Sequence, residues 1–229
     1  MSTLVTEKPL ATRLLRVIKM NLSNPWPTLI TPWLILAVLL TTVFFFELWL
    51  TSIGATGVFF EPEQFLIIYL LVIANQVFLN QFPLALSYGV TRRDFYLGTV
   101  LSLTFVAAVS AAGVILVSVL RGANDPADLL NTAGSTFSAF LASELLAVTL
   151  TSLYFRFRNI GMVTFFVTAG VLITAAPFVV SYLSLWDELE HFAFSSSWEF
   201  ARTVMGWSVI ALMLLIGYGL IRRANPQLR

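Results

Sequence analysis

The chain has 229 residues, of which 58% are hydrophobic and 11% charged, and its mean hydropathy is +0.87. Because about a quarter of the residues in a soluble domain carry charge, these values exclude a soluble globular protein and predict an integral membrane protein. Each helical span needs about 20 apolar residues, so the length allows several spans but no sizeable soluble domain, and any ATPase must be a separate chain. The absence of cysteine excludes disulfides, thiolate metal sites and cysteine catalysis.

The first predicted element is an amphipathic helix over residues 12–22. Cations recur on it every three residues, and apolar residues occupy the other side. The cations are Arg13, Arg16 and Lys19, and the apolar residues are Leu14, Leu15, Ile18 and Leu22. This spacing is typical of a helix that lies in the membrane interface, which makes the three cations candidate anchors and membrane lipids a partner. A helix that covers a soluble core is the alternative, but the chain has no such core. Pro25 and Pro27 should end the helix.

Long apolar runs occupy the rest of the chain and predict six transmembrane helices. They are expected at about residues 28–50, 64–86, 99–120, 129–154, 160–183 and 203–221. Before the last run, residues 185–200 are too polar to span and too apolar to be free in water, which predicts short extracellular re-entrant helices. The predicted fold is an all-α membrane protein with a cytoplasmic tail and interfacial helix in residues 1–27 and a six-span transmembrane domain in residues 28–229.

Small residues mark two of these runs. The third run is rich in Ala, Ser and Gly between residues 107 and 113, and the fourth carries Gly134, Ser138 and Ala142 at four-residue spacing. Small side chains let helix backbones approach closely in a membrane, so the third run is expected to pack closely against a neighbour.

The distribution of basic residues predicts the orientation. With six spans, both termini and the loops after the second and fourth spans lie on one side of the membrane. All 13 Lys and Arg residues except Arg121 and Arg202 fall on that side, and short cytoplasmic loops carry an excess of these residues. We therefore expect a multi-pass protein of the plasma membrane with both termini in the cytoplasm.

Polar side chains interrupt two of the apolar runs. Four amides lie in the second half of the second run, and one acid lies near the middle of the fourth. They are Asn75, Gln76, Asn80, Gln81 and Glu144. In lipid such groups would lack hydrogen-bond partners, so they should face protein or water. The amides either line a translocation path or hold helices together, and Glu144 is either a functional ionisable group or a protonated acid satisfied by neighbouring hydroxyls. Both pairs of interpretations stay open.

Motifs for catalysis are missing from the sequence. It contains no phosphate-binding Gly-Lys-Ser/Thr loop, no His-Glu-x-x-His and no Gly-x-Ser-x-Gly. His191 is the sole histidine and has no clustered ligands, so we expect no metal site. No basic patch exists beyond the membrane-flanking cations, so we expect no nucleic-acid partner. The chain is therefore expected to bind no cofactor and to catalyse no reaction.

A polar, doubly basic segment, residues 87–98, lies between the second and third apolar runs. In it Gly89 permits a tight turn, and Thr91 can cap a short helix that begins at Arg92. Two aromatic residues would be unusual in a merely solvated loop, whereas apolar and cationic groups together suit insertion into a groove on a partner. The alternative is that an Arg-Arg pair simply follows a span, as in many cytoplasmic loops. The predicted docking residues are Gly89, Thr91, Arg92, Arg93, Asp94, Phe95 and Tyr96.

The run FPLALSYGVTRRDFYLGT at residues 82–99, together with the layout of the whole chain, resembles the permeases of the type-2 ABC exporter family, particularly the short actinobacterial-type permeases. The resemblance implies that residues 12–22 are the interfacial helix of that family, that residues 91–97 form the coupling helix that engages the ATPase, and that residues 185–200 are its re-entrant helices. It also implies that ATP and Mg are bound by a partner ATPase, and that the chain pairs with a second copy or with a homologous permease.

We therefore expect the membrane-spanning permease subunit of an ATP-driven exporter, which couples ATP hydrolysis by a separate cytoplasmic ATPase to substrate export. Two alternatives stay open. One is an ATP-independent channel or proton-coupled transporter that uses Glu144, and the other is a membrane scaffold or sensor subunit whose loop recruits a cytoplasmic protein without transport.

Overall fold

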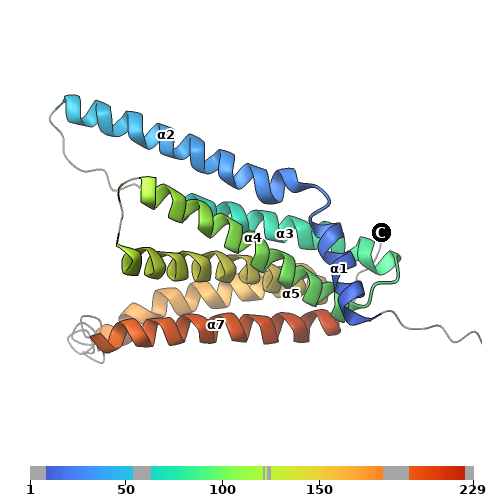
Figure 1. The fold of residues 1–229 in the computed structure, drawn as a ribbon. Helices are drawn as coiled ribbons and strands as arrows, with labels where there is room; N and C mark the ends of the chain where they lie inside the picture. Colours follow the sequence, from blue (N-terminus) through green and yellow to red (C-terminus); the bar gives the residue numbers. More distant parts are fainter. Residues whose placement is uncertain (1–8, 54–62, 121, 123–124, 183–195, 225–229) are drawn as a thin grey trace, which may run out of the picture. The chain divides into compact units, whose positions relative to one another are not determined.

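The structure, a computed structural model, describes part of the chain and is all-helical there (Figure 1). The described residues are 9–53, 63–120, 122, 125–182 and 196–224, with few side chains between 159 and 202. The contacts divide the chain into two compact units, Met1–Val148 and Thr149–Arg229. Each unit is described by itself.

Seven helical elements are described. In chain order they are α1 (Leu10–Asn21), the π-helical turn η1 (Trp26–Ile30), α2 (Thr31–Ser52), α3 (Glu63–Ser87), α4 (Arg92–Leu120), α5 (Pro126–Tyr182) and α7 (Ser196–Arg222). Five stretches are long and apolar enough to cross a membrane: Trp26–Ser52, Gln64–Ser87, Arg92–Leu120, Pro126–Arg158 and Thr203–Arg222. They correspond to the first four predicted spans and the last one, and they support a membrane protein.

The fifth predicted span lies in the second half of α5. The backbone leaves the helical region at Arg158 (φ 56°, ψ −147°), so α5 consists of two helical segments joined by a kink. Most side chains after the kink lie outside the described ones, so the fifth predicted span stays a prediction. The predicted re-entrant segment lies outside the described residues up to residue 195. Residues 196–200 form the start of α7 instead of a separate short helix.

The break between α1 and the first span occurs where the prolines predicted it. The backbone N–H of Leu22 still donates to the Ile18 carbonyl (2.9 Å), and the next helical turn begins at Trp26. The backbone N–H of Trp26 donates a hydrogen bond to the side-chain oxygen of Asn24 (3.2 Å). The first N–H groups of a helix have no acceptor within the helix, and Asn24 supplies one here. The span therefore starts two residues earlier than predicted.

Small residues of α4 allow close packing in the first unit, as predicted for the third span. Ala107, Ser110, Ala111 and Gly113 are buried. The indole of Trp33 on α2 covers Gly113, where an added Cβ would lie 3.3 Å from it. At Gly134 in α5, by contrast, the structure places no neighbour within 4 Å of an added Cβ.

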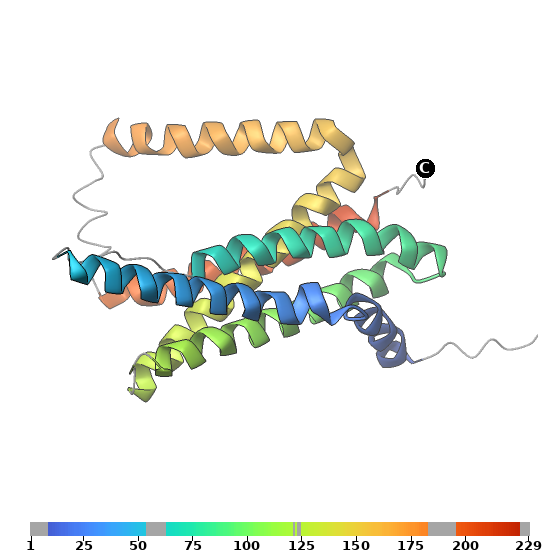
Figure 2. The same ribbon diagram turned by 90° about the horizontal axis from the view of Figure 1, so that it is seen from above.

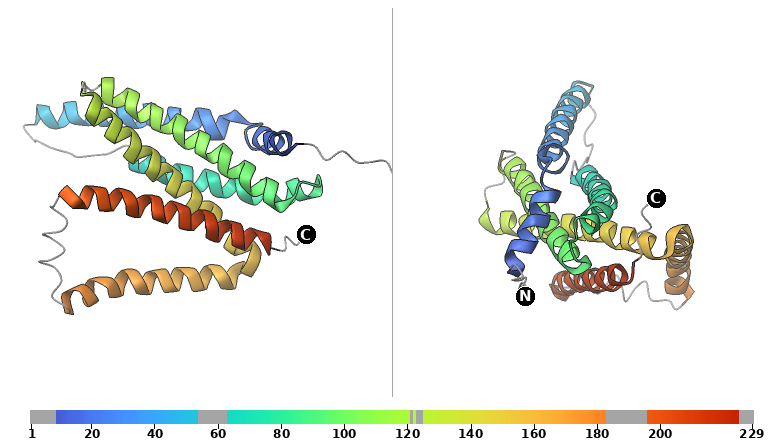
Figure 3. Two further views of the ribbon diagram at one scale, coloured as in Figure 1. Left: turned by 60° about the horizontal axis from the view of Figure 1, so that its bottom comes forward. Right: turned by 90° about the vertical axis from the view of Figure 1, so that its right-hand side faces the viewer.

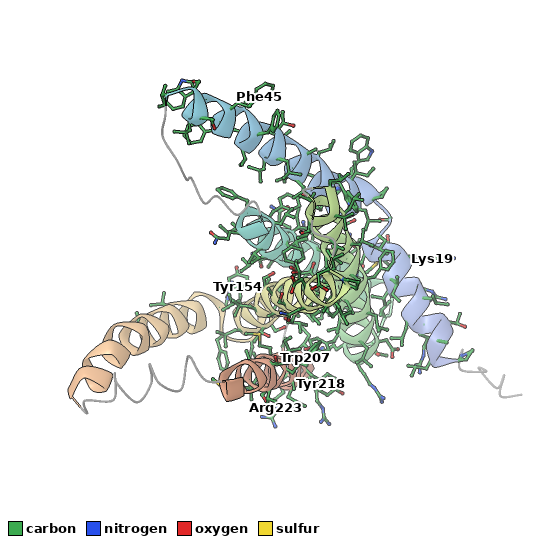
Figure 4. All side chains as sticks on the ribbon, turned by 60° about the vertical axis from the view of Figure 1, so that its left-hand side comes forward. Lys19, Phe45, Tyr154, Trp207, Tyr218 and Arg223 are labelled. Atoms are coloured by element: carbon green, nitrogen blue, oxygen red, sulfur yellow. The ribbon has the colours of Figure 1, made fainter. Side chains whose placement is uncertain are left out.

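The connection between α1 and α2 is also tied to α3. The hydroxyl of Tyr69 donates a hydrogen bond to the carbonyl oxygen of Pro27 (2.7 Å), which joins segments 42 residues apart in the chain. Much of α2 beyond this point presents large apolar side chains to the outside, and Phe45 is an example that projects clear of the helix in Figure 4. Such exposed apolar surface suits contact with lipid.

In the second unit, the part of α5 that begins at Thr149 is joined to α7 by a hydrogen bond from a side chain to a backbone carbonyl. The hydroxyl of Thr149 donates to the carbonyl oxygen of Met213 (3.2 Å). Ser152 and Ile210 are buried, and the guanidinium of Arg156 lies 4.9 Å from the ring centre of Phe157, near the kink.

Candidate functional site

The candidate site is the junction between α1 and the first three turns of α4. Figures 1 and 3 show α1 running across one end of α4. Three contacts connect the two helices in register, each four residues from the last on both: Arg13 with Asp94, Val17 with Gly98, and Asn21 with Ser102. Residues four apart form a ridge on a helix, so one ridge of α1 meets one ridge of α4.

The central contact depends on glycine. A Cβ placed on Gly98 would lie 2.6 Å from the Cβ of Val17 and 3.4 Å from the carbonyl oxygen of Leu14. Real Cβ atoms do not approach each other so closely, so any larger residue at position 98 would push α1 off α4. Val17 itself is 1% exposed. Gly98 therefore sets the distance between the two helices.

Polar contacts hold the two ends of the junction. At one end, Nη1 of Arg13 lies 3.4 Å from Oδ2 of Asp94, whose side chain is 5% exposed. At the other end, the amide nitrogen of Asn21 donates to the hydroxyls of Thr99 (3.1 Å) and Ser102 (3.0 Å). Asn21 is buried, so these bonds replace water for a group that would otherwise be costly to bury.

The start of α4 is capped by the residue that the sequence indicated. The hydroxyl of Thr91 accepts a hydrogen bond from the backbone N–H of Asp94 (3.1 Å), and the Thr91 carbonyl accepts one from the Phe95 N–H (2.9 Å). Asp94 carries negative charge in the first turn, where the helix dipole favours it. The predicted helix does begin at Arg92, but it continues without a break into the third span, so there is no separate short helix.

The turn before Thr91 is equally well defined. Gly89 has φ 74°, a conformation that side chains disfavour. The N–H groups of Gly89 and Val90 donate to the carbonyls of Leu86 and Ala85 (both 3.0 Å), a Schellman motif that ends α3. The predicted tight turn at Gly89 is therefore confirmed.

An aromatic cluster fixes the start of α4 against α3. The ring of Phe95 lies 5.2 Å from that of Phe78 and 5.3 Å from that of Phe82, centre to centre. All three side chains are fully buried. Such aromatic contacts stabilise a packed core, so the turn between α3 and α4 has a rigid base.

These contacts change the role of several predicted docking residues. Asp94, Phe95 and Tyr96 are buried inside the first unit, so the expectation that the aromatic pair is presented to a partner is wrong in this conformation. The physical reason is that the helix starts at the turn itself and presents Asp94 to α1 and Phe95 to α3. The docking residues at the surface are Gly89, Thr91 and Arg93, with Arg92 half-buried.

Sequence reasoning missed an aromatic residue that is well exposed in this turn. Tyr88, the last residue before Gly89, is 71% exposed. Its position at the end of α3, directly before the glycine of the turn, was the signal that could have identified it. Figure 2 shows the turn between α3 and α4 at the same end of the first unit as α1. Tyr88 and Arg93 therefore provide an aromatic and a cationic group on one exposed turn.

The predicted interfacial anchors divide into two kinds. Arg13 faces Asp94, and its Nε is buried with no hydrogen-bond partner among the described residues. Arg16 and Lys19 are exposed, and Figure 4 shows Lys19 projecting from α1 away from α4. Arg13 therefore joins two helices, and the other two cations remain available for an outside partner.

The amides of α3 do not form one cluster. Gln76 and Asn80 are exposed, whereas Asn75 and Gln81 are half-buried. Asn75 makes a polar or ring contact within the structure. The side-chain oxygen of Gln81 is buried and has no hydrogen-bond partner in the described part of the chain. A path lined by all four is therefore not assembled within this unit.

Glu144 is the most completely buried acid among the described residues, at 1% exposure. Neither carboxylate oxygen has a hydrogen-bond partner in the described ranges. The hydroxyl of its neighbour Ser143 donates instead to the carbonyl of Phe140 (2.7 Å) on the same helix. No hydroxyl of a neighbouring helix is found to satisfy Glu144 among the described residues, both interpretations of this acid stay open, and an ionisable group inside a span is a candidate for function.

No group of three or more His, Cys, Asp or Glu side chains that could hold a metal occurs among the residues described, and His191 lies outside them. No protein family, curated protein or solved structure matches this chain.

Proposed function

We propose that this chain is the membrane-spanning subunit of an ATP-driven exporter, and that its α3–α4 turn docks on a separate cytoplasmic ATPase. The observation that carries the proposal is the rigid mounting of this turn. A turn that transmits movement must be stiff, and this one is held by a Schellman motif, an N-cap and a buried aromatic cluster.

The turn also carries groups suited to a protein interface. Tyr88 is an exposed aromatic and Arg93 an exposed cation, and Tyr and Arg are the residues most enriched at interface hot spots. The basic bias of the sequence predicts that this turn lies on the cytoplasmic side of the plasma membrane, where an ATPase would lie. ATP and Mg would be bound by the ATPase, and this chain would catalyse nothing itself.

Movement of the turn would be passed directly into a span. Because α4 runs unbroken from Arg92 to Leu120, a displacement of the turn displaces a whole transmembrane helix. A pathway for cargo would require a second copy of the chain or a homologous permease, with the spans of the two subunits rearranging around it.

The test is co-purification with a candidate ATPase from the same operon, followed by measurement of ATP hydrolysis. Tyr88→Ala with Arg93→Ala should abolish complex formation and stimulated hydrolysis. Leu130→Ala, at an equally exposed position on α5, is the matched control and should leave both unchanged. Retention of the complex by the double variant would refute docking through this turn. Retained binding without any transport by the native complex would indicate a scaffold or sensor.

A second candidate function is a proton-coupled transporter that works without ATP. The observation that favours it is the buried carboxyl of Glu144, which has no partner among the described residues. An acid in that setting can take up and release a proton during transport. The measurement is flux driven by a pH gradient in proteoliposomes that contain no ATPase, with Glu144→Gln expected to abolish it. Absence of gradient-driven flux in the native protein would remove this candidate.

A further inference from the structure

We propose that the exposed face of α1, formed by Thr12, Leu15, Arg16 and Lys19, binds anionic phospholipid headgroups, and that the α1–α4 junction transmits this binding to the turn at residues 88–91. The chain would then sense the charge of the leaflet in which it lies. This concerns the behaviour of the chain alone in a bilayer, so it stands or falls separately from the exporter proposal.

The charge of this face selects an anionic partner. Arg16 and Lys19 are exposed, α1 contains no acidic residue, and the nearest acid in contact with it, Asp94, is 5% exposed and paired with Arg13. The exposed face of α1 therefore presents positive charge alone. Juxtamembrane cations of this kind are attracted to anionic lipids of the cytoplasmic leaflet.

The apolar part of the face selects a membrane over a soluble acidic protein. Leu15 is 55% exposed and lies between the cations, where it can enter the boundary between headgroups and acyl chains. The course of α1 across the end of α4, a spanning helix, suits a helix in the plane of the interface (Figure 1). The cations on the exposed side of α1 match the charge of anionic headgroups, and the exposed leucine matches the apolar region beneath them.

The opposite face of α1 makes the connection to the turn. Arg13, Val17 and Asn21 all contact α4 within its first three turns, at Asp94, Gly98 and Ser102. Asp94 is itself held by the N-cap residue Thr91, which is the last residue of the turn. A shift or tilt of α1 toward the membrane therefore moves the start of α4 and the turn with it.

The absence of cysteine in the chain makes the test direct. Tyr88→Cys places a single spin label on the turn, and Ser135→Cys places one at an exposed position on α5 as the control label. Each labelled protein is put into nanodiscs of phosphatidylcholine with increasing fractions of phosphatidylglycerol. The label at residue 88 should change its mobility with the phosphatidylglycerol fraction, and the label at residue 135 should not. High salt should reduce the change, because the attraction is electrostatic.

Two sets of variants separate the lipid site from the junction. Arg16→Gln with Lys19→Gln should abolish the response at residue 88, whereas Arg222→Gln with Arg223→Gln removes the same charge from the end of α7 and should leave it intact. Asp94→Asn with Asn21→Ala weakens the junction. In this double variant, a spin label introduced by Thr12→Cys on α1 should still change its mobility with the phosphatidylglycerol fraction, whereas a label at residue 88 should no longer do so.

Several results would overturn the proposal. One is a label at residue 88 of the native protein whose mobility does not change with the phosphatidylglycerol fraction. The others are a change in that mobility that remains after Arg16 and Lys19 are replaced, or that remains after the junction is weakened. If the junction double variant does not fold, Asp94→Asn alone still tests whether the junction transmits lipid binding to the turn. It replaces one oxygen of one side chain with an amide nitrogen, and it should reduce the response at residue 88.

Discussion

Val17 of α1 lies directly on Gly98 of α4, so closely that a Cβ on the glycine would be 2.6 Å from the Cβ of the valine. This contact is the centre of a junction that ties a short amphipathic helix to the start of a membrane span. The ion pair and the amide hydrogen bonds at its two ends depend on the same spacing. Position 98 therefore controls the whole junction.

Gly98→Ala should destabilise the protein by about 1–3 kcal/mol, because the added methyl group overpacks against Val17. The usual gain of about 1 kcal/mol from replacing glycine in a helix opposes this and does not outweigh it. Adding Val17→Ala should recover only part of the loss, because it removes the Cγ1 atom that would lie 2.7 Å from the new Cβ but keeps the Cβ of residue 17 at 2.6 Å. The measurement is the thermal unfolding midpoint in detergent.

Gly134→Ala is the matched control for this prediction, because the structure leaves open space around Gly134 in α5. It should stabilise the protein by about 0.5–1 kcal/mol through helix propensity alone. If both glycine variants were equally stabilised, α1 would not lie on α4 as described.

The ion pair of Arg13 and Asp94 should show a coupling energy of about 1 kcal/mol in a double-mutant cycle of Arg13→Gln and Asp94→Asn. Arg13 is 37% exposed, so solvent screens part of the attraction, although Asp94 is almost fully covered. The free energies come from denaturant titration of the four proteins. Arg16→Gln combined with Asp94→Asn should be additive, since Arg16 is exposed on the other side of α1, and equal coupling in both cycles would argue against a specific pair.

Phe95→Ala should cost about 3–5 kcal/mol, because it removes a fully buried ring from the cluster with Phe78 and Phe82. Tyr88→Ala should change stability by less than about 0.5 kcal/mol, because its side chain is mostly exposed. Unfolding monitored by tryptophan fluorescence compares the two variants. A Phe95 variant as stable as the Tyr88 variant would mean that Phe95 faces outward and belongs to the docking surface after all.

Arg158→Gly should make the protein more stable than Arg158→Ala by about 1 kcal/mol or more. Arg158 has φ 56° and ψ −147°, a backbone conformation that glycine adopts readily and other residues do not. The comparison with alanine removes the effect of the lost charge, because both variants lack it. Thermal unfolding of the two variants decides the matter, and a lower midpoint for the glycine variant would contradict the kink.

Several local features could be predicted from the sequence because they depend on neighbours along the chain. The helical amphipathicity of residues 12–22, the break at Pro25, the tight turn at Gly89 and the cap at Thr91 are each determined within one or two turns of backbone. Five long apolar helices followed from length and hydropathy in the same way, although the third begins at Arg92 and not at residue 99.

The orientation of side chains around those helices could not be predicted. A helix that is apolar on all sides carries no periodic signal, because lipid and protein interior are equally apolar, so hydropathy does not tell which face packs. Phe95 was thus expected at the surface and is buried between α3 and α4. The small residues of α4 pack closely, whereas Gly134 at similar spacing on α5 faces open space.

The sequence by itself determined that this is a helical protein with membrane-spanning segments, and that a capped, basic turn separates two of them, because composition and local chemistry suffice for both. The tertiary structure decided that Arg13 pairs with Asp94, that Gly98 admits Val17, and that Tyr88 is the exposed aromatic of the turn. The first two facts join residues that lie far apart in the chain. All three arise from how the helices pack, which depends on three-dimensional fit and cannot be read from either segment alone.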